Sequence, residues 1–343
     1  MLTDFPVVMD LAKLPSAVRS WLYIDAQSGG EDIRLTTSDG TTTLNYERKN
    51  FAKAASTVTG EIYFKVPSVD NAAVTDLYLY AGNSGASDGE NATGAWNADF
   101  LGVYHGEESG DHIGNDYLDS TSNANHMQGG SGIAGKTPTR VAGAIGYAQD
   151  YDGGDDHIKR TSGPLTTQTQ NVTMEAYVNP DSSSDVGVVM TNGSPGFSGY
   201  SLYQQNGSGG AGAIYVVLLG GITYSVTGAS GPSVTAGSYQ HVAATRDTST
   251  WRLYKNGVVH GTTGTTNPNT PASYAAIGGY GANGWDGKID EVRFSNVERS
   301  AAWLKFTYNN IAASDNELQN FSLEENASTI PIFDHHYRML RRA

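Results

Sequence analysis

The chain has 343 residues, of which 42 are glycine and 20 are tyrosine, and only 16% of its residues are charged. This composition favours a β-rich, turn-rich fold, and the length is sufficient for two domains that each bury a core. A formal net charge of −14 argues against nucleic-acid binding, which requires a basic surface. The absence of cysteine excludes disulfides and thiolate metal sites.

Export and membrane signals are also missing from the sequence. The first ten residues, MLTDFPVVMD, lack the basic start and the long apolar run of a signal peptide. No segment approaches 18 uninterrupted apolar residues, so we predict no membrane span and no membrane partner. We expect a protein that is secreted by another route, cut from a longer precursor, or released by lysis as part of a virus particle. The predicted location is therefore a virion surface or the extracellular space.

Residues 1–100 are predicted to form an N-terminal β-sandwich domain. Short extended runs at regular spacing are typical of a sandwich, and here they begin at Phe5, Asp32, Thr43, Gly60 and Thr75. In the fourth run Ile62, Phe64 and Val66 point to one side, which predicts a half-buried strand. A tight turn is predicted at Ser38-Asp39-Gly40.

Four motifs in this region are Asp4-Phe5-Pro6, Asp32-Ile33-Arg34, Val66-Pro67 and Leu79-Tyr80-Ala81-Gly82-Asn83. Together they resemble an uncharacterised β-sandwich domain. That domain normally has a further strand before its Asp-Phe-Pro motif, so the resemblance implies that a first strand is missing here. An uncovered edge strand is a template for pairing, and we expect a neighbouring chain to cover it.

Residues 101–146 are interpreted as a connector, and residues 147–312 as a second sandwich. The connector holds His105-Gly-Glu-Glu-Ser-Gly-Asp-His112, which we interpret as a solvated loop rather than a metal site, because no visible element fixes the ligand spacing. In the second sandwich, Asn256-Gly257 between two extended runs predicts a type I′ hairpin turn. From Lys288 to Asn296 the residues alternate, which predicts a strand with Ile289 and Glu291 on one side and Asp290 on the other.

The second sandwich carries motifs of a known family. These are Tyr147–Ile158, Met174–Pro180, the hairpin from Tyr239 to Val259, and Trp285–Phe294. Their order resembles the laminin-G-like, concanavalin A-type jelly roll, and the uncharacterised domain of residues 1–100 is commonly fused directly ahead of it. The resemblance implies an all-β protein of two β-sandwich domains, the C-terminal one a concanavalin A-like jelly roll.

The chain is predicted to end in a short helix and a tail. Ser300 is a suitable N-cap, and Trp303, Phe306 and Thr307 fall on one helical face. Residues 313–343 form a tail that mixes aromatic and basic residues and contrasts with the acidic body. Such a tail is either frayed or docked on a partner. The docking residues we predict are Phe333, Tyr337, Arg338, Arg341 and Arg342.

A structural calcium ion is predicted from the acidic turn that follows Tyr147. Ca²⁺ prefers six to eight oxygen ligands. Relatives of the family hold an ion near this place, and pairing of the first and last strands would bring the turn to Asp290. The predicted ligands are Asp152, Asp155 and Asp290. The alternative is that these aspartates cap turns through their own backbone.

A glycan site is predicted in the loops of the jelly roll. Sugar binding uses aromatic faces together with amide or carboxylate groups, and the candidates are Tyr200, Tyr224, Tyr280, Asn283 and Trp285. The alternative for each aromatic residue is ordinary packing, which is common in β-sandwiches.

Catalysis is not predicted. Concanavalin-like glucanases carry Glu-x-Asp-x-x-Glu along one strand, and the sequence has no such run. Glu175 stands alone, and Glu291 is expected to face away from Asp290.

We therefore predict a non-catalytic adhesion or decoration protein, associated with a virion such as a phage capsid or tail. Its lectin-like domain recognises glycans, its tail binds other virion proteins, and it forms a homo-oligomer. The alternatives are a structural protein that binds no sugar and a secreted carbohydrate-active module.

Overall fold

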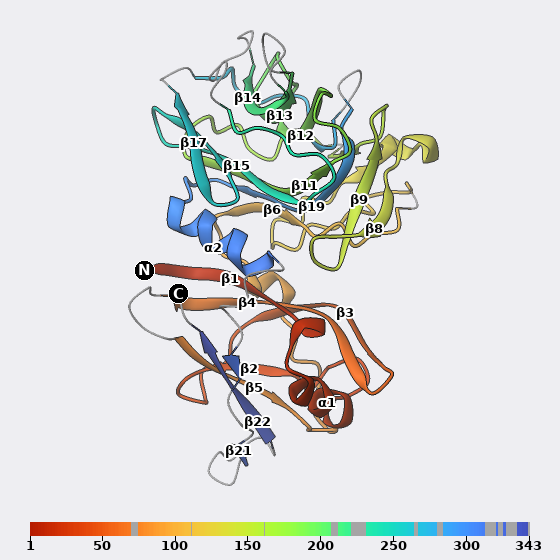
Figure 1. The fold of residues 1–343 in the computed structure, drawn as a ribbon, viewed down its shortest axis with the longest axis vertical. Helices are drawn as coiled ribbons and strands as arrows, with labels where there is room; N and C mark the ends of the chain where they lie inside the picture. The colour runs from red at the N-terminus through yellow and green to blue at the C-terminus, as the bar shows by residue number, and fades with distance from the viewer. Residues whose placement is uncertain are drawn as a thin grey trace. The chain divides into compact units, whose positions relative to one another are not determined.

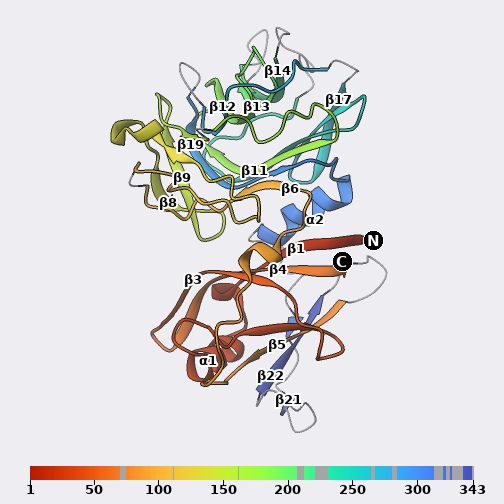
Figure 2. The same ribbon diagram turned by 180° about the vertical axis from the view of Figure 1, so that it is seen from behind.

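A computed structural model describes residues 1–69, 75–110, 112–160, 162–206, 212–220, 231–263, 267–279, 284–312, 320–321, 325–326 and 335–341 (Figures 1 and 2). The chain forms two compact units. The first combines Met1–Asn97 with Asn309–Ala343, and the second is Ala98–Tyr308. Over these described ranges the fold is mostly β, with two short α-helices. No helix in the described ranges has the length and apolar character needed to cross a membrane.

The first unit contains an antiparallel sheet with β4 (Thr57–Val69) between β1 (Leu2–Asp10) and β3 (Tyr46–Ala54). Ile62, Phe64 and Val66 of β4 are buried, as predicted. Tyr63 on the other side of the strand is buried as well, with its ring centroid 5.9 Å from that of Trp96. This central strand is therefore covered on both faces.

Helix α1 (Ser16–Asp25) in the first unit was not predicted from the sequence. It follows Pro15 and buries Val18, Trp21 and Leu22, which are spaced three and four residues apart as on one helical face. The spacing was visible in the sequence, but the extended runs on either side obscured it.

The open edge of β1 is covered at one point by a side chain of the same unit. The amide of Asn310 accepts a hydrogen bond from Val8 N and donates one to Val8 O, both at 2.8 Å. The Asn310 amide thus occupies the place of a neighbouring strand's peptide group. At Val8 this role does not require a second chain, although we predicted that a neighbouring chain would cover this edge.

The tail adds a strand to the first unit. β22 (His335–Arg341) pairs antiparallel with β5 (Thr75–Ala81), from His335 opposite Ala81 to Arg341 opposite Thr75. The rest of this sheet consists of β2 (Arg34–Thr37), β20 (Asn320–Phe321) and β21 (Glu325–Asn326).

This internal pairing differs from the predicted tail, which was either frayed or docked on a partner. Tyr337, Arg338 and Arg341 lie on β22, and Phe333 and Arg342 lie outside the described residues. Docking of these residues on a partner remains a prediction.

The second unit consists of two antiparallel sheets that pack face to face (Figure 1). One sheet has the order β14-β13-β12-β18-β10-β7. Its strands are β7 (Gln128–Gly129), β10 (Ile158–Lys159), β12 (Gly187–Asn192), β13 (Tyr200–Gln205), β14 (Ile214–Leu219) and β18 (Ala275–Ile277). The other has the order β17-β16-β15-β11-β19-β9-β8, with β6 also paired to β19. Its strands are β6 (Phe100–Tyr104), β8 (Thr139–Ala142), β9 (Tyr147–Asp152), β11 (Val172–Pro180), β15 (Gln240–Arg246), β16 (Trp251–Lys255), β17 (Val258–Thr263) and β19 (Asp286–Ser295).

The core of this sandwich lies between the two sheets and contains residues from nearly every strand, including Val178, Leu202, Trp251, Leu253 and Trp285. Strands β6, β7 and β8 come from the segment that we interpreted as a connector. They pair with β19, β10 and β9 respectively, so this segment is part of the second unit.

Two local predictions are confirmed in this unit. Asn256 and Gly257 have φ values of 51° and 70°, and two positive values are what a type I′ turn requires. Helix α2 (Ala301–Ile311) begins after Ser300, whose Oγ accepts a hydrogen bond from Trp303 N at 3.2 Å. The predicted face of Trp303, Phe306 and Thr307 is buried.

Candidate functional site

An open hollow of about 390 Å³ lies at the edge of the second unit. We call it the acidic hollow, because five aspartates line it: Asp150, Asp152, Asp156, Asp181 and Asp286. A second open hollow of about 630 Å³ adjoins it, and the two share Ala134, Thr137 and Thr139. Arg140 and His112 line the second hollow. Both hollows are large enough to accept a small ligand.

The strand register explains why the aspartates gather there. Asp152 of β9 lies opposite Asp286 of β19, and Asp150 lies opposite Lys288. Asp150 and Asp152 share a face because side chains alternate along a strand. Asp181, directly after β11, donates a backbone hydrogen bond to the carbonyl of Asp286 at 3.1 Å. The ends of three strands thus bring these carboxylates together.

The carboxylates of the acidic hollow are only partly neutralised. Lys288 Nζ lies 3.6 Å from Asp150 Oδ1 and 3.3 Å from Asp181 Oδ1. Burial and the neighbouring charge of Asp152 raise the pKa of Asp156 to about 6. Burial, a hydrogen bond with Asp185 and the charge of Asp181 also raise the pKa of Asp286. Mutual repulsion of this kind favours a bound cation or a ligand that donates hydrogen bonds.

The three predicted calcium ligands do not come together. The predicted strand pairing exists, but Asp152 pairs with Asp286, which places Asp290 about 14 Å further along the ladder. Asp290 Oδ2 accepts hydrogen bonds from Ala144 N at 2.7 Å and Ile145 N at 3.2 Å. Asp155 pairs with Lys136 at 2.7 Å. Within the described part of the chain, no three His, Asp or Glu side chains are arranged to hold a metal ion.

Two of the predicted sugar-binding aromatics are core residues. Tyr200 is 2% exposed and Trp285 is 1% exposed, and both belong to the core cluster. Tyr200 packs on Trp251 with 5.7 Å between ring centroids, and its hydroxyl accepts a hydrogen bond from Asn192 at 3.1 Å. Their positions on the inward face of the sandwich correct the prediction, because a buried ring cannot stack on a sugar. Tyr224, Tyr280 and Asn283 lie outside the described residues.

A β-bulge in β19 changes which side chains share a face. Asp290 lies opposite Tyr177 and Arg293 opposite Glu175, so Glu291 and Val292 together face one residue of β11. Glu291 has a φ of 48°, and Val292 turns into the core with Ile289. The predicted strict alternation was therefore wrong from Glu291 onwards.

The bulge helps to form a group that we call the buried charge cluster: His105, Glu175, His241, Glu291 and Arg293. Glu291 accepts from Arg293 at 2.7 Å and lies 2.6 Å from His105 Nδ1. Glu175 Oε2 lies 3.2 Å from His241 Nε2. Burial acts to raise the pKa of Glu175, but the hydrogen bond from His241 and the charge of Arg293 outweigh it and lower that pKa. Glu175 is therefore paired and does not stand alone.

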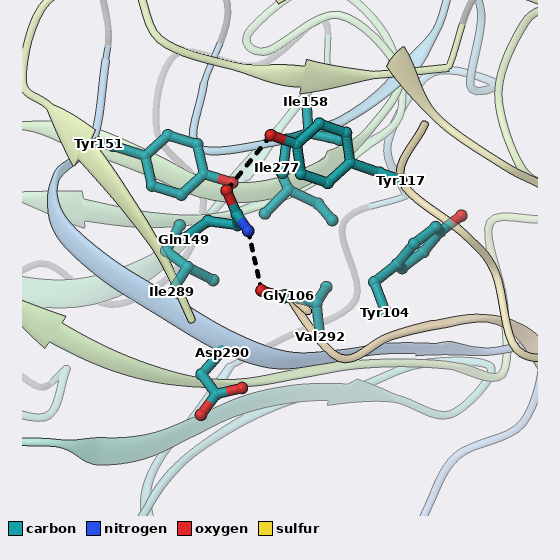
Figure 3. A pocket seen from close by; sticks show the side chains of 10 residues that line it. All are labelled: Tyr104, Gly106, Tyr117, Gln149, Tyr151, Ile158, Ile277, Ile289, Asp290 and Val292. Carbon is teal, nitrogen blue, oxygen red and sulfur yellow. Dashed lines mark hydrogen bonds between the residues drawn. The ribbon is translucent and has the colours of Figure 1, made fainter. Parts of the chain in front are cut away.

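A small enclosed cavity lies inside the sandwich (Figure 3). Tyr117 donates to Gln149 at 3.2 Å, and Gln149 donates to the carbonyl of Gly106 at 2.8 Å. The carboxyl of Asp290 points away from Tyr151 and Gln149 in this view. With about 10 Å³ the cavity has room for one water molecule, so it is part of the core and not a ligand site.

Two antiparallel sheets packed face to face define a β-sandwich of the jelly-roll class. Residues 152–305 match the family described as the concanavalin A-like lectin/glucanases superfamily, and residues 29–105 match a domain of unknown function, DUF2341. The chain therefore carries a laminin-G-type concanavalin A-like domain preceded by a DUF2341 domain, which confirms the resemblance seen in the motifs. No curated protein sequence matches the chain significantly.

Several solved structures are similar to this chain at low identity. Domain 4 of AbnA, an extracellular arabinanase of Geobacillus stearothermophilus solved with arabinotriose, is 17% identical, with 63% of this chain and 100% of that chain covered and a TM-score of 0.46. The binding domain of Paraclostridial Mosquitocidal Protein 1 is 11% identical, with coverages of 66% and 58% and a TM-score of 0.42. The binding domain of botulinum neurotoxin DC, solved with SialylT, is 8% identical, with coverages of 67% and 57% and a TM-score of 0.39. The chain thus spans less than two thirds of the two toxin binding domains.

Proposed function

We propose that this protein is a non-catalytic adhesion or decoration protein whose jelly roll recognises glycans at the acidic hollow. The observation that carries the proposal is the gathering of five aspartates around an open hollow at the edge of a concanavalin A-like domain. Carboxylates accept hydrogen bonds from sugar hydroxyls, and the adjoining hollow with Arg140 extends the surface for further sugar units.

Calcium is part of this proposal, at the acidic hollow instead of at Asp290. These aspartates are not a preformed ligand set, so Asp150, Asp152, Asp156 and Asp286 would have to draw together around the ion; carboxylate oxygens are its preferred ligands, and a cation relieves their mutual repulsion. Bound there, Ca²⁺ would supply positive charge and rigidity to the edge of the sandwich.

A glycan array, probed with and without a calcium chelator, tests the proposal. We expect Asp286→Asn to weaken binding at least tenfold, because Asp286 lies at the centre of the strand ends that form the acidic hollow. The matched control is Glu298→Gln, which removes an exposed carboxylate of the same unit that pairs with Arg252. Equal binding by both variants and the wild type would place the glycan site elsewhere.

The finer part of the proposal is a location on a virion. The aromatic, basic tail supports an anchored particle protein that exposes its jelly roll. Deletion of residues 328–343 should abolish co-sedimentation with particles and reduce any oligomer seen by light scattering. Because β22 is part of the first unit, Arg338→Ala with Arg341→Ala is the milder companion variant. Retained association in both variants would contradict anchoring by the tail.

A structural protein without sugar binding is the second candidate function. The burial of Tyr200 and Trp285 favours it, because two of the expected sugar platforms are used for packing. A blank glycan array together with retained particle association would support this candidate. Release of reducing sugars from a polysaccharide would instead support a carbohydrate-active module.

A further inference from the structure

Among the described residues of the second unit, the large apolar side chain with the highest exposed fraction is a phenylalanine. Phe197 is 79% exposed and lies in the loop between β12 and β13. Within the described residues its ring makes no aromatic or cation–π contact. Single exposed apolar side chains are common on protein surfaces, so the exposure of Phe197 has meaning only together with the way its loop holds the ring and with the groups beside it.

The backbone hydrogen bonds of this loop hold Phe197 in place. Phe197 N donates to Ser194 O at 2.9 Å, and Gly199 N donates to Asn269 O at 2.8 Å. Ser198 Oγ accepts from Ser194 N at 3.0 Å and from Ala272 N at 3.2 Å. The ring is therefore presented from a preformed loop, which reduces the entropy lost when a ligand binds.

Glycine is required at Gly199 for the loop to form. Its φ is 69°, and a Cβ there would lie 1.9 Å from the carbonyl oxygen of Asn192. This close approach fixes the path of the chain immediately after Phe197.

The two segments around Phe197 are uncharged and combine serine, threonine and asparagine with glycine, proline and alanine. Residues 193–199 and the facing residues 267–273 contain no Asp, Glu, Lys, Arg or His. Asn269 and Thr270 are exposed, and Ser194 is half-buried. Amides and hydroxyls beside an aromatic face are the groups that bind a neutral sugar ring.

A protein partner fits this surface less well than a sugar. Stable protein interfaces contain a contiguous apolar centre. None of the other large hydrophobic side chains described as exposed lies in residues 193–199 or 267–273. In the part of the chain that the structure describes, a single exposed aromatic ring with asparagine, serine and threonine in the adjoining segments matches one sugar unit.

The Phe197 loop is distant from the acidic hollow. The start of β12 lies against the acidic end, since a Cβ on Gly187 would lie 2.8 Å from Gly284 O, two residues before Asp286. The far end of this six-residue strand leads into the loop, roughly 17 Å away. A glycan of several units is needed to contact both places.

We propose that Phe197 is the stacking platform of a second, charge-free sugar subsite that binds a neutral saccharide unit. This inference rests on the proposed function, because it assigns another contact for the same class of ligand. It adds that neutral sugars are bound at this end of the jelly roll, whereas the acidic hollow, which favours a cation, lies at the other end.

Tryptophan fluorescence gives a direct test with Phe197→Trp. All five native tryptophans are buried, with exposures between 0% and 5%, so the new indole is the one exposed to solvent. Neutral cello-, xylo-, manno- and arabino-hexaoses serve as probes. When one of these hexaoses binds, we expect the fluorescence emission of the Phe197→Trp indole to shift to shorter wavelength. The bound sugar should also protect that indole from quenching by acrylamide. Phe197→Ala should weaken its binding about tenfold or more while the circular dichroism spectrum is unchanged.

The control is Val258→Ala, which shortens another exposed apolar side chain of the same unit and should leave the affinity unchanged. If wild type and Phe197→Ala bind a hexaose equally and the Phe197→Trp emission does not respond, the subsite is wrong while glycan binding stands. If the wild type binds no glycan on the array, both proposals fail. An emission shift with phosphatidylcholine vesicles, and none with any hexaose, would overturn the sugar assignment in favour of a lipid surface.

Discussion

Strand β19 carries carboxylates in two contrasting environments. In its middle, Glu291 is buried and paired with Arg293 at 2.7 Å and with His105 at 2.6 Å. At its start, Asp286 faces four other aspartates in an open hollow with Lys288 as a nearby cation. A charge that is buried must be compensated by the protein itself, whereas a half-exposed group of like charges can be left for a ligand to compensate. In this strand, a carboxylate whose charge is neutralised by protein partners is structural, whereas a carboxylate left among like charges is a candidate binding group. The number of carboxylates does not distinguish the two.

The largest effect is expected from breaking the buried charge cluster. Arg293→Met leaves the buried Glu291 without its guanidinium partner and should lower the free energy of unfolding by about 3–5 kcal/mol. The matched control is Arg252→Met, which removes an arginine that pairs with Asp247 and Glu298 while remaining partly exposed. It should cost less than about 1 kcal/mol. Urea unfolding measures both, and equal losses would contradict the comparison.

A smaller effect is expected at Asp290. Burial and the charge of Glu291 raise the pKa of Asp290 well above its usual value. The folded state therefore keeps a proton that the unfolded chain releases above about pH 4, so stability should fall as pH rises from there through the raised pKa. Asp290→Asn removes this loss and should be more stable than the wild type at pH 8 by about 1 kcal/mol or more.

The experiment for Asp290 is denaturant unfolding between pH 4.5 and 8.5. Asp247→Asn is the control, because hydrogen bonds from Ser249 N and Arg252 hold the pKa of Asp247 below its usual range. Its contribution to stability is lost only below about pH 4, so this substitution should lower the stability equally at every pH of the series and leave the wild-type slope unchanged. A wild-type pH slope that survives in Asp290→Asn would assign the titration to another group.

The smallest effect is expected in the acidic hollow. The pKa of Asp156 is raised to about 6, so in the presence of a chelator its share of stability should decline between about pH 4 and pH 6. The expected size is about 1 kcal/mol, since the hollow is open to solvent. Added Ca²⁺ should flatten the decline in the wild type, and Asp156→Asn should abolish it. If neither added Ca²⁺ nor Asp156→Asn changed the pH dependence of thermal unfolding, calcium would be removed from the proposal.

Local chemistry made part of the fold predictable. The turn at Asn256-Gly257 and the cap at Ser300 depend on neighbouring residues alone, and both predictions are confirmed. The family motifs predicted a jelly roll over residues 147–312, and the family match, over residues 152–305, confirms the family. Alternation also located β4, although not the burial of its second face.

The remaining features could not be predicted because they depend on pairing between strands that are distant in the sequence. The bulge at Glu291 breaks a period of two without a local sequence signal, so it changed the face assigned to every following side chain. The pairing of Asp152 with Asp286 determines which aspartates lie close together. The spacing of the aspartates along the sequence does not reveal this strand register. Trp285 has the residue type of a sugar platform, and its position in the core depends on neighbours distant in the chain.

The discontinuous first unit has a consequence for biosynthesis and for the choice of truncations. Met1–Asn97 is synthesised long before Asn309–Ala343, with more than 200 residues between them. Until those residues have been made, β1 lacks its hydrogen bonds to Asn310 and β5 lacks its pairing with β22. The second unit is continuous in sequence and can fold during that delay. A fragment that ends at Asn97 would expose two strand edges to aggregation, whereas one that spans Ala98–Tyr308 keeps all strands of its two sheets.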